Sequence, residues 1–264
     1  MNRARPTTHG TPERTGPDVI PPCDTEGGRL TPLPDGLGLS VHLTAPAPLV
    51  RLTELLTQAC HRAEERRTPT TVVLHLGGAP GDRSWPGAVG IHDVNRWERA
   101  LRRLERLAAV TVAVARGTCT GPALDLLLAG DYRIADSALR LLLPVNDGHF
   151  WPGTAVHRLA VQLGVARARR LVLWGHELSA AEALDLGVID TVDDDLDAAV
   201  RAATVLRGRI AGTELAVRRQ LLLEAPATSH EDALGAHLAA CDRELRRLRR
   251  TGHAATPVRE GRTP

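Results

Sequence analysis

The order of hydrophobic and polar positions predicts a chain in which buried strands alternate with amphipathic helices. Apolar or β-branched runs of strand length occur at 37–43, 71–76, 110–115 and 188–192. Apolar residues recur every three or four positions over 49–67 and 92–107, which is typical of helices that bury one face. Strands that are apolar on both faces and separated by helices indicate a mainly parallel sheet with right-handed crossovers.

The middle of the chain carries a glycine-rich turn and several shorter elements. The segment "GTCTGPALDLLLAGD" (117–131) predicts a turn and a short helix, and "YRIAD" and "LRLLLP" predict short strands. Two further helices are predicted in "AVHRLAVQLG" and "ARARRLVLWG". A capping box of Ser179 and Glu182 begins another helix, which Gly187 ends. From about 195 the pattern stays helical through Arg250, with a second possible capping pair at Ser229 and Asp232.

The ends of the chain lack this periodicity. Residues 1–35 are rich in Pro, Thr, Gly and Arg and predict a disordered leader. We expect a single core over 36–200, a helical region over 201–250 and a flexible tail over 251–264. No internal repeat of 20–50 residues divides the core.

Composition excludes several classes of function. The net charge is +2 and aromatic residues make up 2% of the 264 residues, so few groups could attract or stack on nucleic acid. No run approaches the roughly 20 apolar residues that span a bilayer, and the first residues lack the apolar stretch of a secretory signal. The four cysteines are scattered, which disfavours a disulfide framework or zinc site and suits a reducing cytoplasm. The chain contains no lysine, which excludes Schiff-base chemistry.

The segment "TVAVARGTCTGPALDLLLAGDYRIAD" resembles the strand, turn and helix that build half of the active site in the crotonase (enoyl-CoA hydratase/isomerase) superfamily. The likeness continues through Pro144 and "WPGTAVHRLAVQLGVARARRLVLWGHELSAAEALDLGVIDTV", and covers about residues 71–192. It implies an α/β fold of the ClpP/crotonase type, with a ββα spiral core and C-terminal helices. It also implies a homo-trimer or homo-hexamer, and coenzyme A as part of the substrate with no separate cofactor or metal.

A narrower resemblance lies in "WERALRRLER", "ALDLLLAGDYRIA", "GTELAVRRQLLLEA" and "ALGAHLAACDRELRR". These segments are similar to the hydratase-like accessory proteins of actinomycete dihydroxyphenylglycine biosynthesis, a route to glycopeptide antibiotics. In that route a type III polyketide synthase makes dihydroxyphenylacetyl-CoA. The resemblance therefore implies a polyketide thioester as substrate, help in its dehydration and aromatisation, and the synthase as a partner.

Crotonase chemistry requires two backbone N–H groups that face the thioester oxygen, where negative charge develops. By the resemblance, the first donor is Ala88, after Gly87, but Val89 replaces the family's usual aspartate. The second donor position falls on Pro122, which has no N–H. The alternatives are a weakened oxyanion hole, or a one-residue shift in which Gly121 or Ala123 supplies the donor.

The same resemblance places carboxylates in the site. Asp125 aligns with the first catalytic carboxylate, and its leucine neighbours would raise its pKa by desolvation; the alternative is an acid held at a helix N-terminus. The second carboxylate position is Val145, so an ordinary hydratase is not expected. Asp147 and His149 could reach the pocket, or could belong to a solvated "NDGH" turn.

Other polar residues have simpler interpretations. We expect His92 and Asp93 to mark a helix start, Cys119 to pack in the core, and 243–250 to be an amphipathic helix with a solvated arginine face. Three functions remain open at this point. The first is acid–base catalysis on a thioester. The second is a non-catalytic partner subunit of a polyketide synthase or of another crotonase-like protein, which includes assembly as a hetero-oligomer. The third is a thioesterase.

Overall fold

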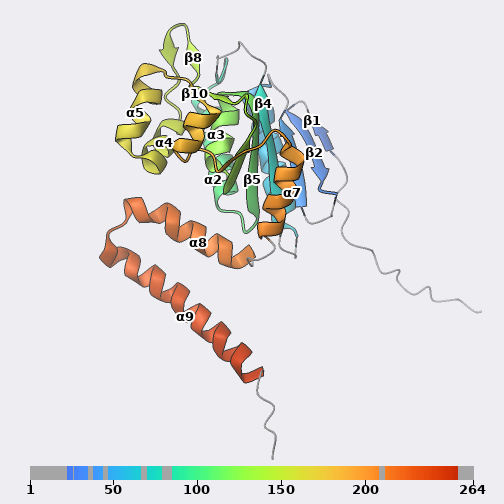
Figure 1. Cartoon of the computed structure of the whole chain (residues 1–264), viewed down its shortest axis with the longest axis vertical. Coiled ribbons are helices and arrows are strands. Elements are labelled where there is room, and N and C mark those ends of the chain that lie inside the picture. Colours follow the sequence, from blue (N-terminus) through green and yellow to red (C-terminus); the bar gives the residue numbers. More distant parts are fainter. Residues whose placement is uncertain are drawn as a thin grey trace, which may run out of the picture.

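The computed structural model describes residues 23–25, 27–34, 38–43, 47–66, 70–78, 85–207 and 212–254 (Figure 1). Its main sheet runs in the order β1-β2-β3-β4-β5-β6-β11. The strands from β3 to β11 in that order are parallel, and β1 and β2 extend the β3 edge in antiparallel pairing. The strand bounds are β1 Cys23–Thr25, β2 Gly28–Pro32, β3 Gly38–Leu43, β4 Thr71–Gly78, β5 Val110–Cys119, β6 Tyr132–Ala135 and β11 Thr191–Val192.

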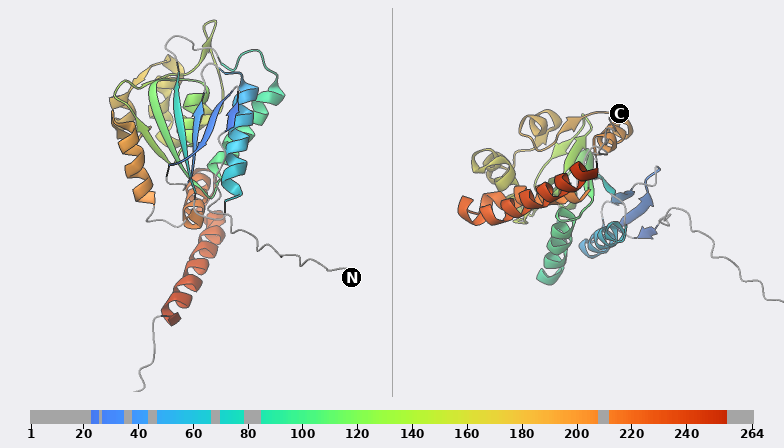
Figure 2. Two further views of the ribbon diagram at one scale, coloured as in Figure 1. Left: turned by 90° about the vertical axis from the view of Figure 1, so that its right-hand side faces the viewer. Right: turned by 90° about the horizontal axis from the view of Figure 1, so that it is seen from below.

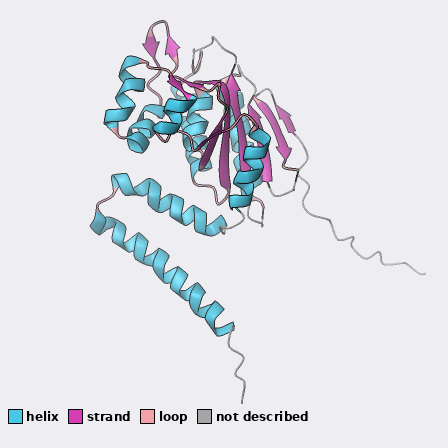
Figure 3. Cartoon of the chain, viewed as in Figure 1, coloured by secondary structure: helices cyan, strands magenta, loops and turns pink. Residues whose placement is uncertain are grey.

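Helices cover both faces of this sheet (Figure 3), which is why its strands are apolar on both sides. Val72 and Leu74 of β4 join the larger core cluster, whereas Val73 between them joins a second cluster on the opposite face. The larger cluster is closed by α1 (Leu49–Glu64), α2 (Ile91–Glu105) and α3 (Pro122–Ala129), and the second by α7 (Leu196–Arg207). The predicted mainly parallel α/β sheet is confirmed.

A second group of short elements lies beyond the C-terminal end of β5. The end of β5 pairs with β7 (Arg140–Leu141), which pairs in turn with β10 (Leu178–Ser179). A separate hairpin, β8 (Val145–Asn146) and β9 (His149–Phe150), projects at the top of Figure 1. This group also contains α4 (Ala155–Leu163), α5 (Val165–Trp174) and α6 (Ala180–Asp185), and α6 begins with the predicted capping box.

Two predicted boundaries differ from the structure at the N-terminus and the core. Cys23–Thr25 and Gly28–Pro32, assigned to the disordered leader, form β1 and β2, because β2 pairs with β3 and buries Leu30 completely. Residues 1–22 lie outside the described part of the chain. The predicted core ended at 200, but α7 continues to Arg207 and packs on the sheet.

The C-terminal region consists of α8 (Gly212–Glu224), a short 3-10 helix at Ala225–Ala227, and α9 (His230–Ala254). Helix α9 starts with the predicted Ser229 cap, whose hydroxyl accepts from the Asp232 N–H at 3.1 Å. It continues four residues into the segment predicted to be a flexible tail. In Figure 2 (left), α9 extends away from the sheet. Within the described residues, no helix is long and apolar enough to cross a membrane.

Candidate active site

The turn between β5 and α3 brings together the residues that the resemblance placed in the oxyanion hole. Gly121 has φ of +53°, a left-handed conformation that favours glycine. A Cβ at this position would lie 3.0 Å from Cγ of Trp85, so the indole also excludes a larger residue. Pro122 occupies the first turn of α3, where its missing N–H costs the helix nothing.

The backbone donors of this turn are not equivalent. Pro122 has no N–H, and the Ala123 N–H already donates to the Thr120 carbonyl at 3.2 Å. Among the described residues, the Gly121 N–H has no acceptor. Of Gly121 and Ala123, the two residues that could supply the donor missing at Pro122, the geometry therefore favours Gly121. The Thr120 hydroxyl beside it is buried and also lacks a partner among the described residues.

The loop after β4 supplies the other predicted donor. Gly87 has φ of +81°, and the Val89 N–H donates to the Gly87 carbonyl at 3.0 Å. Ala88 is exposed, and its N–H has no acceptor in the described part of the chain. Because the Trp85 ring packs on Gly121, this loop and the β5–α3 turn lie side by side.

Asn146 fixes the start of that loop, a role that the sequence alone did not reveal. Its Oδ1 accepts from the Trp85 N–H at 3.0 Å, and its Nδ2 donates to the Trp85 carbonyl at 2.8 Å. The contact therefore joins the β8–β9 hairpin to the loop that carries Ala88. Val89, which stands where the family has an anchoring aspartate, offers no polar group for this purpose.

Asp125 lies on α3 with only 4% of its surface exposed. Its Oδ2 accepts from the Trp97 indole N–H of α2 at 3.0 Å. Burial raises the pKa of Asp125 to about 7, although the hydrogen bond from Trp97 acts in the opposite direction. The carboxyl group is therefore divided between its protonated and ionised forms near neutral pH, as suits a general acid or base.

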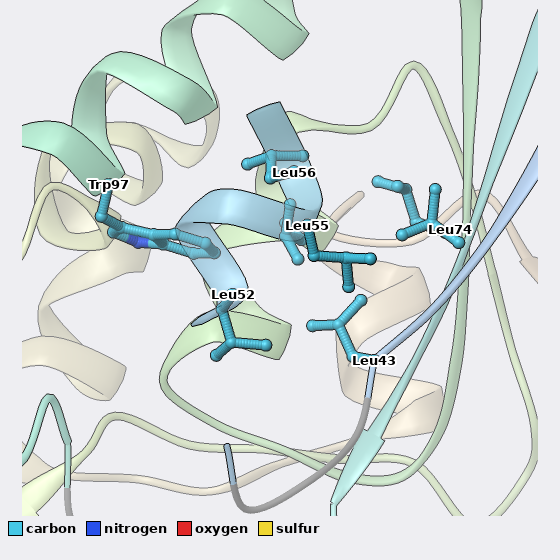
Figure 4. A pocket seen from close by; sticks show the side chains of 8 residues that line it. Leu43, Leu52, Leu55, Leu56, Leu74 and Trp97 are labelled. Atoms are coloured by element: carbon cyan, nitrogen blue, oxygen red, sulfur yellow. The ribbon is translucent and has the colours of Figure 1, made fainter. Parts of the chain in front are cut away.

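The opposite side of Trp97 faces an apolar void (Figure 4). The void is about 10 Å³, which is at the lower limit for a single water molecule. It is lined by leucines of β3, α1, β4 and α3 together with Val41.

A charged cluster lies beside Asp125 and joins α2 to α4. The buried Arg158 donates from Nε to Glu105 at 2.7 Å and lies 3.6 Å from Glu98. Thr154 bridges the two elements, since it contacts both Arg158 and Glu98. For the segment that contains Arg158 the sequence predicted a helix; the partners of this arginine lie on α2, more than 50 residues away, and could not be predicted from the segment itself.

The remaining predicted site residues lie on the β8–β9 hairpin. Val145 is part-buried and brings no carboxylate to the site. Asp147 and Gly148 form its turn, with φ of +48° and +81°, as a two-residue hairpin requires. Asp147 and His149 are both exposed. The structure thus brings Asp125, Gly121 and Trp85 together, while Asp147 remains on the solvent-exposed turn and its catalytic role stays a prediction.

Three other polar residues occupy the positions that the sequence indicated. The Asp93 carboxylate accepts from the Gly90 N–H at 3.3 Å at the start of α2, and His92 is exposed. Cys119 is buried, and burial raises the pKa of its thiol to about 12, so it is not a nucleophile at neutral pH. Within the described ranges, no group of three His, Cys, Asp or Glu side chains could hold a metal ion.

The raised pKa of Asp125 predicts a specific dependence of stability on pH. The folded protein binds the Asp125 proton up to about pH 7, whereas the unfolded chain releases it near pH 3.8. Stability from this group is therefore complete below pH 4 and is lost as the pH rises to 7, by up to about 4 kcal/mol. From pH 5 to pH 8 the stability of the wild type relative to Asp125→Asn should therefore fall by about 3 kcal/mol, as measured by urea unfolding of both proteins at the two pH values. An Asp185→Asn variant, altered at an exposed aspartate, should follow the wild type.

Known proteins of one family are similar to this chain in sequence. Residues 93–255, more than half of the chain, match the family described as enoyl-CoA hydratase/isomerase. A protein of Amycolatopsis orientalis named enoyl-CoA-hydratase is 45% identical over 194 residues, which cover 74% of this chain and 89% of the relative. A shorter match, 35% identical over 96 residues, covers 35% of this chain and 14% of the fatty acid oxidation complex subunit alpha of Aliivibrio fischeri.

Solved structures share the fold at lower identity. A Thermobifida fusca protein crystallised in complex with acetoacetyl-CoA superposes with a TM-score of 0.70, at 23% identity, over 84% of this chain and 96% of its own. An enoyl-CoA hydratase of Shewanella pealeana gives a TM-score of 0.68, at 18% identity, over 82% and 88% of the two chains. The predicted crotonase-like fold is confirmed by these structures.

Proposed function

Because the chain belongs to the enoyl-CoA hydratase/isomerase family, we propose that it acts on an acyl-CoA thioester. Asp125 would transfer the proton, and the N–H groups of Ala88 and Gly121 would face the thioester oxygen. One observation carries this proposal: a buried carboxyl group with a pKa of about 7 lies four residues after a backbone donor that has no acceptor among the described residues. The acetoacetyl-CoA complex of the Thermobifida fusca protein supports the class of ligand.

A single carboxyl group can support the elimination of water from a 3-hydroxyacyl thioester. Ionised Asp125 takes the proton from the α-carbon, and the developing enolate oxygen is stabilised by the two N–H groups. The protonated carboxyl group then gives its proton to the departing hydroxyl group, so that water leaves and the carboxylate is restored. Because Val145 provides no second carboxylate, Asp125 would have to carry both proton transfers, and by microscopic reversibility it would do so in either direction. We therefore propose proton transfer and the reversible elimination of water as the reaction types, with the direction set by the relative free energies of substrate and product.

The finer proposal is that the thioester is a polyketide and that the chain assists its dehydration and aromatisation to dihydroxyphenylacetyl-CoA. The resemblance of 97–106, 123–135, 212–225 and 233–247 to the accessory proteins of that route supports it. The test is to supply malonyl-CoA to a type III polyketide synthase of that route, with and without this protein. We expect the aromatic thioester to increase when the protein is present; an unchanged yield would contradict the finer proposal.

A second candidate is a non-catalytic partner subunit, which the loss of a donor at Pro122 and of a carboxylate at Val145 would permit. In that case the protein would raise the synthase yield equally well with Asp125→Asn. A thioesterase is a weaker candidate, and it requires that the protein alone release coenzyme A from thioesters in an Asp125-dependent manner. Chromatography of the coenzyme A products separates this outcome from the other two.

We also propose that the chain assembles with further copies of itself through α9. Leu234, Leu238, Cys241, Leu245 and Leu248 follow a 4-3-4-3 spacing, which places them on one stripe of the helix. All five are exposed in the single chain. In a parallel pair of such helices, Glu244 would face Arg249 of the second copy, five residues further along, with opposite charge. The stripe, the charges and the resemblance to the crotonase superfamily, which implies a homo-trimer or homo-hexamer, support a homo-oligomer.

Charge on this stripe is expected to separate the copies. We predict that Leu238→Glu together with Leu245→Glu lowers the mass measured by light scattering to that of one chain. Ala236→Glu, on a different face of α9, should leave the mass of the oligomer unchanged. An oligomer that persists in the double variant would show that α9 is not the contact, and a monomeric wild type would contradict the assembly itself.

A further inference from the structure

We infer that Asn146 is a positioning residue that holds both backbone donors of the proposed site in place. It does so through Trp85. The inference rests on the proposed function, because that proposal identifies the N–H groups of Ala88 and Gly121 as the donors. The hairpin that carries Asn146 lies 61 residues beyond Trp85 in sequence, yet its side chain meets both polar groups of the Trp85 backbone.

The contact is specific for an asparagine. The primary amide offers one acceptor and one donor, and these match the N–H and the carbonyl of a single residue at 3.0 Å and 2.8 Å. An aspartate could keep the bond from the Trp85 N–H, but its second oxygen would face the Trp85 carbonyl without a proton to share. An alanine would lose both bonds.

Trp85 passes this constraint to two parts of the site. Its ring lies against Gly121, whose N–H has no acceptor in the described part of the chain and is one proposed donor. The same ring meets Trp97 edge-to-face, with centroids 6.0 Å apart and planes at 73°. Trp97 in turn holds Asp125. The Trp85 backbone leads within three residues to Ala88, the other proposed donor.

The loop needs such an anchor because its own contacts are few. Gly87 has a positive φ and Ala88 is exposed. Within the described chain, the sole hydrogen bond between residues of 86–89 runs from the Val89 N–H to the Gly87 carbonyl and closes a tight turn. The hairpin can supply the anchor because its Asp147–Gly148 turn fixes the register in which Asn146 faces His149. The Asn146 side chain is then free to reach Trp85.

The first measurement is hydrogen exchange of the amides of 85–90 in the full-length protein. We expect Asn146→Ala to speed exchange at Trp85 and along the loop. Asn146→Asp should keep protection at the Trp85 amide, whose acceptor remains, while the rest of the loop exchanges faster. Asn95→Ala, which removes an exposed asparagine from α2, is the matched control and should exchange as the wild type does.

The second measurement is the infrared carbonyl stretch of bound acetoacetyl-CoA, labelled at the thioester carbon, together with its affinity. We expect the wild type and Asn95→Ala to lower the stretching frequency, because the two N–H groups polarise the bond. Asn146→Ala should lose most of this shift while its affinity stays within about threefold, and product formation should fall about 100-fold through kcat rather than KM.

The outcomes separate this inference from the proposed function. A wild-type frequency shift that survives in Asn146→Ala would overturn the inference and leave the proposed function intact. If the wild type neither binds the thioester nor shifts its stretch, the proposed function fails, and hydrogen exchange alone decides whether Asn146 anchors the loop. Equal exchange in Asn146→Ala and Asn95→Ala would overturn the anchor in either case.

Discussion

Replacing Asp125 by asparagine is expected to lower the rate of aromatic product formation by about 10²–10⁴-fold, the usual contribution of a general acid or base. Asparagine has nearly the same shape, and its oxygen can still accept from the Trp97 indole, so the fold should persist. The substitution removes the titratable proton of the carboxyl group, because an amide neither gains nor loses a proton near neutral pH. The measurement is the product yield per unit time when the synthase is combined with wild type or variant at equal concentration.

The pH dependence of the same reaction provides an independent check. Because ionised Asp125 takes the first proton and its pKa is about 7, the rate should rise as the pH increases through about 7. The residual activity of Asp125→Asn should lack this rise. The Asp185→Asn variant serves as the control for removal of one negative charge. A variant at Asp125 that keeps wild-type activity would end the acid–base role and leave the partner subunit as the better interpretation.

The fold could be predicted because its pattern is strong and local. Strands 71–76 and 110–115 are apolar on both faces, and this arrangement has few solutions other than a parallel sheet covered by helices. The N-terminal strands were missed because β1 and β2 are short and rich in Gly, Pro, Thr and charge. Their stability comes from pairing with β3, which local sequence does not reveal.

The candidate site was only partly predictable. Asp125, Ala88 and the defects at Pro122 and Val145 are visible because they occupy fixed positions in a motif. The sequence could also have predicted that Asp125 accepts a hydrogen bond from a buried donor such as a tryptophan N–H, since a buried carboxyl group and a buried indole N–H both require a hydrogen bond. The role of Asn146 could not be predicted, because its partners are backbone atoms 61 residues away and every residue type except proline offers the same N–H and carbonyl.

The link between the sheet and the C-terminal helices was also hidden, and it yields the second large prediction. Arg219 of α8 is 8% exposed and reaches into the core below β5. Its Nε donates to Asp131 at 2.6 Å, its Nη2 donates to the Ala109 carbonyl at 2.8 Å and contacts Asp131, and its Nη1 contacts the Leu107 carbonyl. Nη1 also lies 3.4 Å from the Glu105 carbonyl, so one guanidinium group satisfies a carboxylate and three carbonyl groups.

We expect Arg219→Met to lower the free energy of unfolding by about 3–5 kcal/mol, because it leaves the Asp131 carboxylate part-buried without its cation and the carbonyl groups without donors. Arg218→Met is the matched control: this neighbour is exposed and pairs with Glu214 at 3.0 Å, so its loss should cost less than about 1 kcal/mol. Urea unfolding followed by circular dichroism measures both.

Adding Asp131→Asn to Arg219→Met should recover part of the lost stability, since the uncompensated charge is then gone. If the two single variants were equally stable, α8 would be held not by this ion pair but by apolar contacts such as the packing of Leu215 against the second core cluster.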